Sequence, residues 1–155
     1  MTAVQASVLV RAAPAAVWDV LVDWPGQSRW IPFTTVDVVG DRDRGIGVRA
    51  VALSGRRLGR IPVGLLDRFV VTGWTAPTGR GAAELEVLHL GPYFTGVGVF
   101  RLEPASGGTA VRCTEVFEVP GGRLVEVPVR AVLRVLERGL QRSLRSLAAI
   151  VEAGQ

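Results

Sequence analysis

Residues 128–153, PVRAVLRVLERGLQRSLRSLAAIVEA, decide the fold because they predict one long amphipathic helix. At 100° per residue, the aliphatic side chains fall within one stripe, and the Arg, Glu and Gln side chains lie on the opposite side. Pro128 suits the first helical turn and Gly154 suits a C-terminal cap. We therefore expect a helix from Pro128 to Ala153, about 39 Å long at 1.5 Å per residue.

Two residues inside the apolar stripe of this helix are poor core fillers. Gly139 costs about 1 kcal/mol compared with Ala in a helix interior, and Ser143 places a hydroxyl among aliphatic side chains. One explanation is that Gly139 allows a strand to approach closely and that Ser143 bonds back to its own helix. The other explanation is that the helix faces a cavity here, and both explanations stay open.

The composition indicates a single domain over residues 1–155 that can bury a substantial core. No segment approaches the roughly 18 uninterrupted apolar residues of a membrane span, and the N-terminus does not resemble a signal peptide. We therefore expect a cytoplasmic protein with no transmembrane segment. The single cysteine, Cys113, cannot form an internal disulfide, which agrees with a reducing compartment.

The charged residues give little reason to expect nucleic acid as a partner. All 18 basic residues are arginines, and they are spread along the whole chain. The densest cluster, Arg56, Arg57 and Arg60, has no aromatic residues between its members, which is typical of a solvated surface. One His and one Cys make no metal cluster, and no phosphate-binding loop is visible, so we expect no metal and no cofactor.

Most of the chain before the long helix shows the alternation of β-strands. A first strand, Val4–Val10, is followed by a short helix from Pro14 and by a second turn or helix over Pro25–Trp30. The other predicted strands are Thr34–Val39, Gly47–Leu53, Arg68–Thr75, Ala82–Leu90, Gly96–Glu103 and Thr109–Val119. The segment from Ser54 to Leu66 is Gly-rich and too long for a hairpin turn, so it predicts a loop over one end of the sheet.

This order of elements predicts an α+β fold. Short turns make the strands antiparallel, and a curved seven-stranded sheet has one face that the single large helix can cover. We expect the sheet to wrap on the C-terminal helix, with two short helices after the first strand. Side chains alone are not expected to fill the space near the N-terminal half of the helix, so a cavity is predicted there.

Several segments occur in an order that resembles a known superfamily. They are Val10–Trp24, Trp30–Pro32, Gly45–Arg49, Asp67–Pro77, Gly96–Phe100 and Arg142–Leu147. Together they resemble the helix-grip superfamily called SRPBCC, which includes START lipid-transfer domains, birch-pollen-allergen-like proteins and the polyketide cyclase/dehydrase family. The resemblance implies a sheet that grips the long helix around a hydrophobic cavity. It does not specify the chemistry, because members bind or transform unrelated apolar molecules.

The alternation of side chains predicts that the only histidine faces this cavity. Glu84 and Glu86 should point to water, because both are acidic and share one face of their strand. His89 then lies on the opposite face, together with Leu85 and Val87. We therefore expect His89 on the inner face of the sheet.

The same alternation places Cys113, Glu115 and Phe117 on the inner face of the last strand. A neutral His89 with the Glu115 carboxylate as its partner would serve as a general base or acid for an enolisation or an aldol-type ring closure. These two residues are the candidate catalytic pair. The alternative is that His89 is wet and idle at a strand end, that Glu115 pairs with an arginine such as Arg49, and that Cys113 is a small buried hydrophobe.

Further residues are candidates for binding a ligand because they lie on the predicted inner faces or near the mouth of the sheet. The candidate ligand-binding residues are Trp24, Trp30, Arg49, Phe100, Cys113, Phe117, Leu133, Leu136, Gly139, Leu140 and Ser143. Trp24 and Trp30 belong either to the core or to the rim of the entrance.

Three functions stay open. The preferred one is binding of an apolar or aromatic small molecule, as a carrier, sensor or sequestering protein; the second is a polyketide cyclase or aromatase that uses His89 and Glu115. The third is an interaction module whose open mouth or arginine face docks a protein or a membrane, and a homodimer is also open. Titratable groups that converge in a pocket would favour the enzyme, a purely apolar pocket the carrier, and a collapsed cavity the interaction module.

Overall fold

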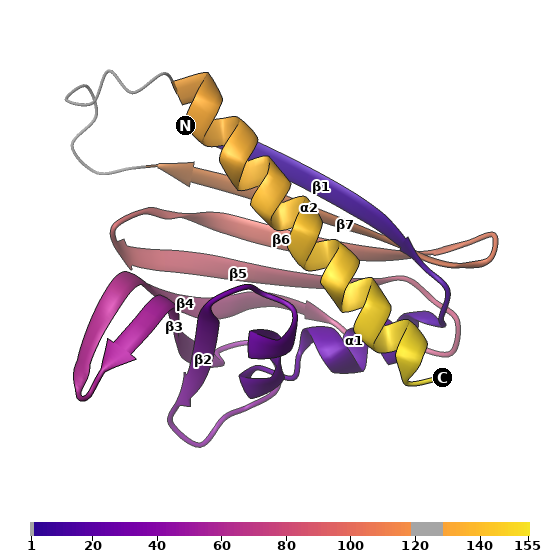
Figure 1. Cartoon of the computed structure of the whole chain (residues 1–155). Helices are drawn as coiled ribbons and strands as arrows, with labels where there is room; N and C mark the ends of the chain where they lie inside the picture. Colours follow the sequence, from indigo (N-terminus) through magenta and orange to yellow (C-terminus); the bar gives the residue numbers. More distant parts are fainter. Residues whose placement is uncertain (1, 119–128) are drawn as a thin grey trace.

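In this computed structural model a seven-stranded antiparallel sheet curves around a long C-terminal helix (Figure 1). The structure describes residues 2–118 and 129–155, apart from the side chains of residues 57, 62 and 129–132. The elements are β1 (Thr2–Val10), α1 (Pro14–Leu21), the 3₁₀ helix η1 (Pro25–Arg29), β2 (Thr34–Val39), β3 (Arg49–Leu58), β4 (Ile61–Thr75), β5 (Ala83–Pro92), β6 (Thr95–Ala105), β7 (Gly108–Glu118) and α2 (Val129–Ala153). The predicted fold class is confirmed, although Val119 and Pro128 lie outside the described residues.

The strand order is β1-β7-β6-β5-β4-β3-β2, so the first and last strands of the chain are neighbours. Each of the other pairs joins strands that are consecutive in sequence, and all the pairs are antiparallel. This topology leaves β1 and β2 as edges, and exposed strand edges need cover because their backbone groups are unpaired.

The segment from Ser54 to Leu66 corrects the sequence analysis, because it is a hairpin and not a loop. Its residues extend β3 and β4 to a tight turn after Leu58. Gly55 pairs with Gly64 across the hairpin, and a Cβ added to Gly64 would lie only 2.8 Å from the Gly55 Cα. The glycines that suggested a loop therefore mark a close approach of two strands, which is the other role of glycine in a sheet.

Hydrogen bonds link helix α2 to the edge strand β1 and to Arg11, the residue that follows this strand. The Gln141 side-chain amide donates to the Ser7 carbonyl oxygen at 2.8 Å, and the Arg11 backbone N–H donates to the Glu152 carboxylate at 2.9 Å. The main neighbours of α2 are β1 and α1. In Figure 1 the helix runs diagonally across one face of the sheet toward α1.

The C-terminal half of α2 packs into the core. Leu144 and Leu147 are fully buried and Val151 is nearly so. Helix α1 joins this core through Trp18, whose ring meets Trp74 of β4 edge-on at a centroid distance of 5.0 Å. Helix α1 has no side-chain cap at its N-terminus, because the residue there is Ala13, so packing holds the helix in place.

The described helices are α1, η1 and α2. None of them is both long enough and apolar enough to cross a bilayer.

Candidate functional site

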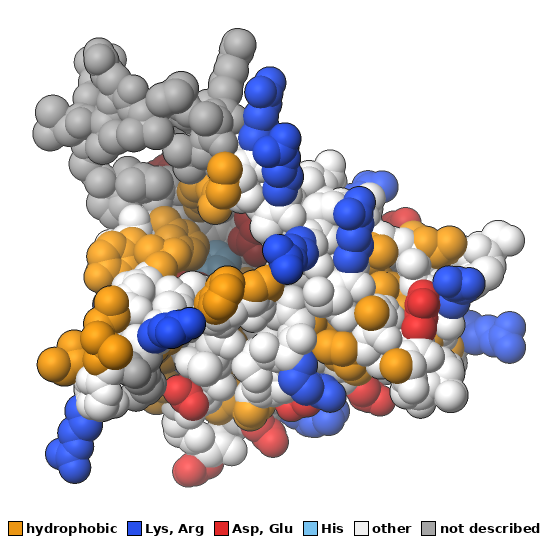
Figure 2. Space-filling model, viewed as in Figure 1, with side chains coloured by type: hydrophobic (Ala, Val, Ile, Leu, Met, Phe, Trp, Pro, Cys, Tyr) orange, Lys and Arg blue, Asp and Glu red, His pale blue; other side chains and the backbone are white. Residues whose placement is uncertain are grey.

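The surface is hollowed beside the N-terminal half of α2 (Figure 2). Val135 and Leu136 of this half are 65% and 40% exposed, and a Cβ added to Gly139 would meet no atom within 4 Å. The hollow lies over β5 and β6, with apolar side chains along most of its rim and basic side chains on the side toward α2. At its floor Figure 2 shows a histidine beside an acidic side chain, and the only histidine of the chain is His89.

His89 is held between two carboxylates. Its Nδ1 lies 2.7 Å from Asp67 Oδ2, and its Nε2 lies 3.2 Å from Glu115 Oε2. The side chains of His89, Asp67 and Glu115 are 11%, 12% and 23% exposed. We call these three residues the acidic triad; Glu115 is its most accessible member.

The triad spans the four neighbouring strands β4 to β7, because the β6 residues between His89 and Glu115 are glycines without side chains. His89 is on β5 and Glu115 is on β7, so β6 runs between them and the two backbones are about 10 Å apart. Gly96 pairs with His89, and Gly98 pairs with Glu115. A Cβ on Gly98 would lie 2.7 Å from both carboxylate oxygens of Glu115, so this carboxylate occupies the space that glycine leaves free.

Asp67 reaches His89 next to an irregularity in the pairing of β4 with β5. Phe69 pairs with His89, but Asp67 pairs with Pro92, which is one residue further than regular pairing would give. Gly91 has a φ of 85°, in the left-handed region that glycine adopts without steric cost. The extra residue bends the strand locally, as β-bulges do beside many functional sites.

Aromatic rings surround the triad. His89 lies 5.1 Å from the Phe94 ring and 6.3 Å from the Phe69 ring, measured between centroids. Phe94 in turn meets Phe117 at 6.2 Å, and Phe69 meets Trp24 at 5.7 Å. The site therefore combines ionised groups with apolar walls.

The histidine is charged at neutral pH, which corrects the expectation of a neutral imidazole. Burial lowers the pKa of His89, but the hydrogen bonds and charges of Asp67 and Glu115 outweigh it and raise the pKa to about 9. An imidazolium between two carboxylates leaves an excess of one negative charge. His89 is thus largely buried and hydrogen-bonded on both sides, and the partner of Glu115 is this imidazolium and not an arginine.

Cys113 precedes Glu115 by two residues on β7 and is fully buried. Its thiol donates to Glu115 Oε1 at 3.7 Å. Burial, together with the nearby Glu115 charge, raises the pKa of Cys113 well above its usual value, so the thiol stays protonated. It has the environment of a small buried hydrophobe and not that of a nucleophile.

Some predicted ligand-binding residues belong to the core or to the outer face of the sheet. Arg49 is exposed on β3 between the buried Val48 and Ala50, so it belongs to the outer face of the sheet. Trp24 and Trp30 are both 2% exposed and belong to the core, so neither is on the rim of an entrance. The Trp24 indole N–H donates to the Asp43 carbonyl oxygen at 2.8 Å.

The predicted residues of α2 separate into two groups. Leu133 and Leu140 are half-buried, whereas Leu136 and Gly139 are exposed. Ser143 is buried and its hydroxyl donates to the Gly139 carbonyl oxygen at 3.0 Å, so it bonds back to its own helix. Gly139 approaches none of the described strands, and the space beside it is open.

On the sheet, Phe117 belongs to the aromatic wall, while Phe100 packs half-buried against the core. Asp67 and Phe94 were not among the predicted site residues. Asp67 alternates with the buried Phe69 and Val71, which was the available signal. This signal was lost because the predicted strand began one residue after Asp67, at Arg68.

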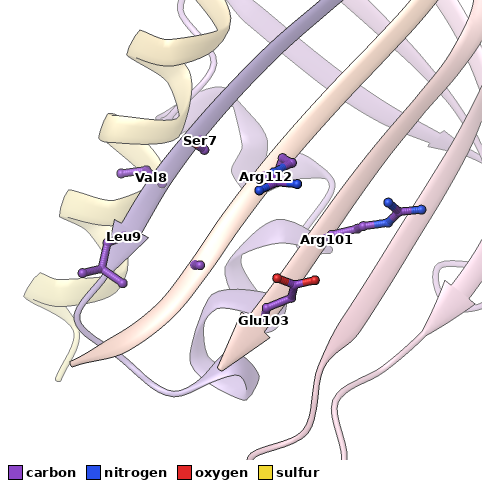
Figure 3. Close-up of a pocket in the computed structure, with 7 residues that line it drawn as sticks. Ser7, Val8, Leu9, Arg101, Glu103 and Arg112 are labelled. Carbon is purple, nitrogen blue, oxygen red and sulfur yellow. The ribbon is translucent and has the colours of Figure 1, made fainter. Parts of the chain in front are cut away.

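A second depression lies on the opposite, outer face of the sheet (Figure 3). Its volume is about 310 Å³, and its lining residues are Ser7, Val8, Leu9, Arg101, Glu103, Ala110 and Arg112. Arg101 is well exposed there, and its side chain is already bound to Glu84 at 2.7 Å. This face has the features of a solvated surface.

The fold has many relatives among solved structures. The protein TTHA0849 from Thermus thermophilus has a TM-score of 0.72 at 16% identity, with 99% of each chain covered. A START superfamily protein from Mycobacterium smegmatis has a TM-score of 0.68 at 16% identity over 99% of each chain. The protein Ara h 8.0201 has a TM-score of 0.64 at 13% identity over 98% of each chain. At these identities the likeness shows the fold alone.

Comparisons of sequence are consistent with this fold. No curated protein matches the chain. The family described as "Polyketide cyclase / dehydrase and lipid transport" matches residues 1–152, almost the whole chain. The helix-grip resemblance is thereby confirmed, and the chain belongs to the polyketide cyclase/dehydrase and lipid transport family.

Proposed function

We propose that this protein binds an apolar or aromatic small molecule in the hollow between the sheet and α2, as a carrier, sensor or sequestering protein. The observation that carries the proposal is a hollow with aromatic side chains around a largely buried floor. Apolar walls that surround a few polar groups are the usual composition of a ligand pocket. The family, which includes polyketide cyclases and lipid-transport proteins, agrees with an apolar ligand at this coarse level.

A direct test uses N-phenyl-1-naphthylamine, an uncharged apolar probe that fluoresces when it leaves water. We expect saturable binding to the purified protein. The Gly98→Leu variant fills the floor of the hollow and should abolish binding. The matched control is Val99→Leu, which enlarges the neighbouring residue on the outer face of the same strand and should bind normally. No binding by the folded protein, or equal binding by both variants, would exclude the hollow as the site.

The convergence of the triad favours a second candidate function, a polyketide cyclase or aromatase type of reaction. Glu115 is the most accessible member and is placed to accept a proton from a carbon acid. The His89 imidazolium is placed next to it to donate a proton to an oxygen that gains charge. The carboxylate and not the histidine is then the base, since His89 is protonated at neutral pH.

This second function can be tested through enolisation alone. In D₂O the protein should accelerate exchange of the α-protons of an acetoacetyl thioester above the buffer rate, as followed by NMR. Glu115→Gln should remove the acceleration, because an amide cannot accept the proton. Exchange at the buffer rate in wild type, with probe binding intact, would leave the protein as a binder only.

A further inference from the structure

The side chains of the acidic triad and of Ser143 offer hydrogen-bond acceptors to the hollow but no free donor. Both ring nitrogens of His89 are engaged, Nδ1 with Asp67 and Nε2 with Glu115. The hydroxyl of Ser143 is also engaged, with the Gly139 carbonyl oxygen. An anionic group that entered the hollow would therefore find the imidazolium already paired on both sides.

Acceptor capacity remains on both carboxylates. Glu115 uses Oε2 for His89 and Oε1 only for the long contact from the Cys113 thiol. Each carboxylate oxygen has two acceptor positions, so Glu115 can accept further hydrogen bonds. Asp67 Oδ1 is buried without a hydrogen-bond donor in the part of the chain that the structure describes. Because Oδ1 of Asp67 is not exposed, the acceptor that a ligand in the hollow can reach is the Glu115 carboxylate.

The net charge of the floor also favours a ligand that donates a hydrogen bond. Two carboxylates face one imidazolium, which leaves one negative charge in excess. Of the arginine side chains that the structure describes, none forms an ion pair with the triad; Arg11, Arg29 and Arg101 pair with Glu152, Asp23 and Glu84. A carboxylate on the ligand would lose its water and meet like charge, whereas an ammonium or a phenol would meet an acceptor.

We propose that the hollow selects apolar ligands whose buried end carries a hydrogen-bond donor, an amine or a phenol, over ligands of equal size that end in a carboxylate. This inference rests on the proposed function, because it assigns the ligand class of the same hollow. Glu115 is the residue that determines the selectivity, since it is the most accessible carboxylate of the triad. Fatty acids and other carboxylate-ended lipids are then poor ligands.

The test compares three naphthalene compounds of similar size as competitors of N-phenyl-1-naphthylamine at pH 7. We expect 2-naphthylmethylamine and 2-naphthol to displace the probe about 10- to 100-fold more effectively than 2-naphthoate, which is the worth of one hydrogen bond to a charged group. In Glu115→Gln the advantage of the amine over naphthoate should fall to near onefold while the probe still binds. The matched control is Glu86→Gln on β5. Glu86 pairs with Gly73 across the sheet and accepts a hydrogen bond from the Thr72 hydroxyl, so this variant should keep the full preference.

The outcomes separate this inference from the proposed function. If the probe binds but naphthoate competes as well as the amine, the inference is wrong and the proposed function stands. If the preference survives Glu115→Gln, the assignment to Glu115 is wrong. If the probe does not bind at all, both proposals are overturned. The ranking on the wild-type protein needs no variant, so it decides the matter even if Glu115→Gln does not fold.

Discussion

The two halves of α2 meet the same sheet in different ways. In the C-terminal half, Leu144 and Leu147 are fully buried in the core. In the N-terminal half, Leu136 is 40% exposed beside the hollow that holds His89. One continuous apolar stripe thus serves as core at one end and borders open space at the other. A regular helical pattern therefore identifies an apolar face without telling what covers it.

The sheet explains the difference. At the packed end its inner face presents the fully buried Leu102 and Val111. At the open end it presents Gly96 and Gly98, which have no side chains to reach the helix, and the ionised triad. These glycines therefore leave a hollow beside the N-terminal half of α2, whose main backbone neighbours are β1 and α1.

The largest effect is expected from cavities at the packed end. Leu147→Ala should lower the free energy of unfolding by about 4 kcal/mol, because it removes a fully buried side chain from a well-packed site. Leu136→Ala, its counterpart at the open end, should cost about 1 kcal/mol or less because the side chain is already partly in water. Urea unfolding of the two variants measures the difference. Equal losses would show that the two halves are packed alike.

His89 at the open end should make the free energy of unfolding depend on pH. The folded-state pKa of His89, about 9, lies above its ordinary value of 6.5, so its stabilising contribution is complete below pH 6.5 and is lost as the pH rises through 9. The loss is on the order of 3 kcal/mol. Urea unfolding at pH 6, 7.5 and 9.5 should show this decline in wild type and not in His89→Gln. Parallel pH profiles for the two proteins would contradict a charged His89 in the triad.

A methyl-bearing side chain on β6 should break the triad. Gly98→Val places atoms where the Glu115 carboxylate lies, so we expect a loss of about 2 kcal/mol from overpacking. The pKa of His89, followed by NMR, should fall from about 9 because Glu115 moves away. Val99→Ile, on the outer face of the same strand, is the control and should leave this pKa unchanged. An unchanged pKa in Gly98→Val would show that Glu115 does not need the space over Gly98.

The smallest effect on stability is expected at Gly139, where it has the opposite sign. Gly139→Leu should stabilise the protein by about 0.8 kcal/mol, since a Cβ there meets no atom and leucine favours a helix. The same change should abolish uptake of N-phenyl-1-naphthylamine if the open space beside Gly139 belongs to the binding site. Ala149→Leu, at an exposed position of the packed half, is the control. Unchanged uptake would remove Gly139 from the site.

The candidate site could be predicted only in part, and the reasons differ from residue to residue. Alternation placed His89 and Glu115 on the inner face because side chains in a strand point to opposite faces in turn. Their contact was not predictable, since it depends on which strands are neighbours and on the glycines between them. Asp67 was missed because the glycine pair of the β3–β4 hairpin resembles a loop. The sequence did not decide whether Trp24 lies in the core or on the rim of the entrance, because an aromatic side chain suits both places.

The sequence by itself determined the elements of the fold and their faces, because helical and strand periodicity are local properties of the chain. It also determined the family, whose features are spread along almost all of its length. Only the tertiary structure decided that three strands bring Asp67, His89 and Glu115 into one cluster and that the histidine is charged. The physical reason is that distance, burial and the resulting pKa depend on residues far apart in the chain, and no local pattern records them.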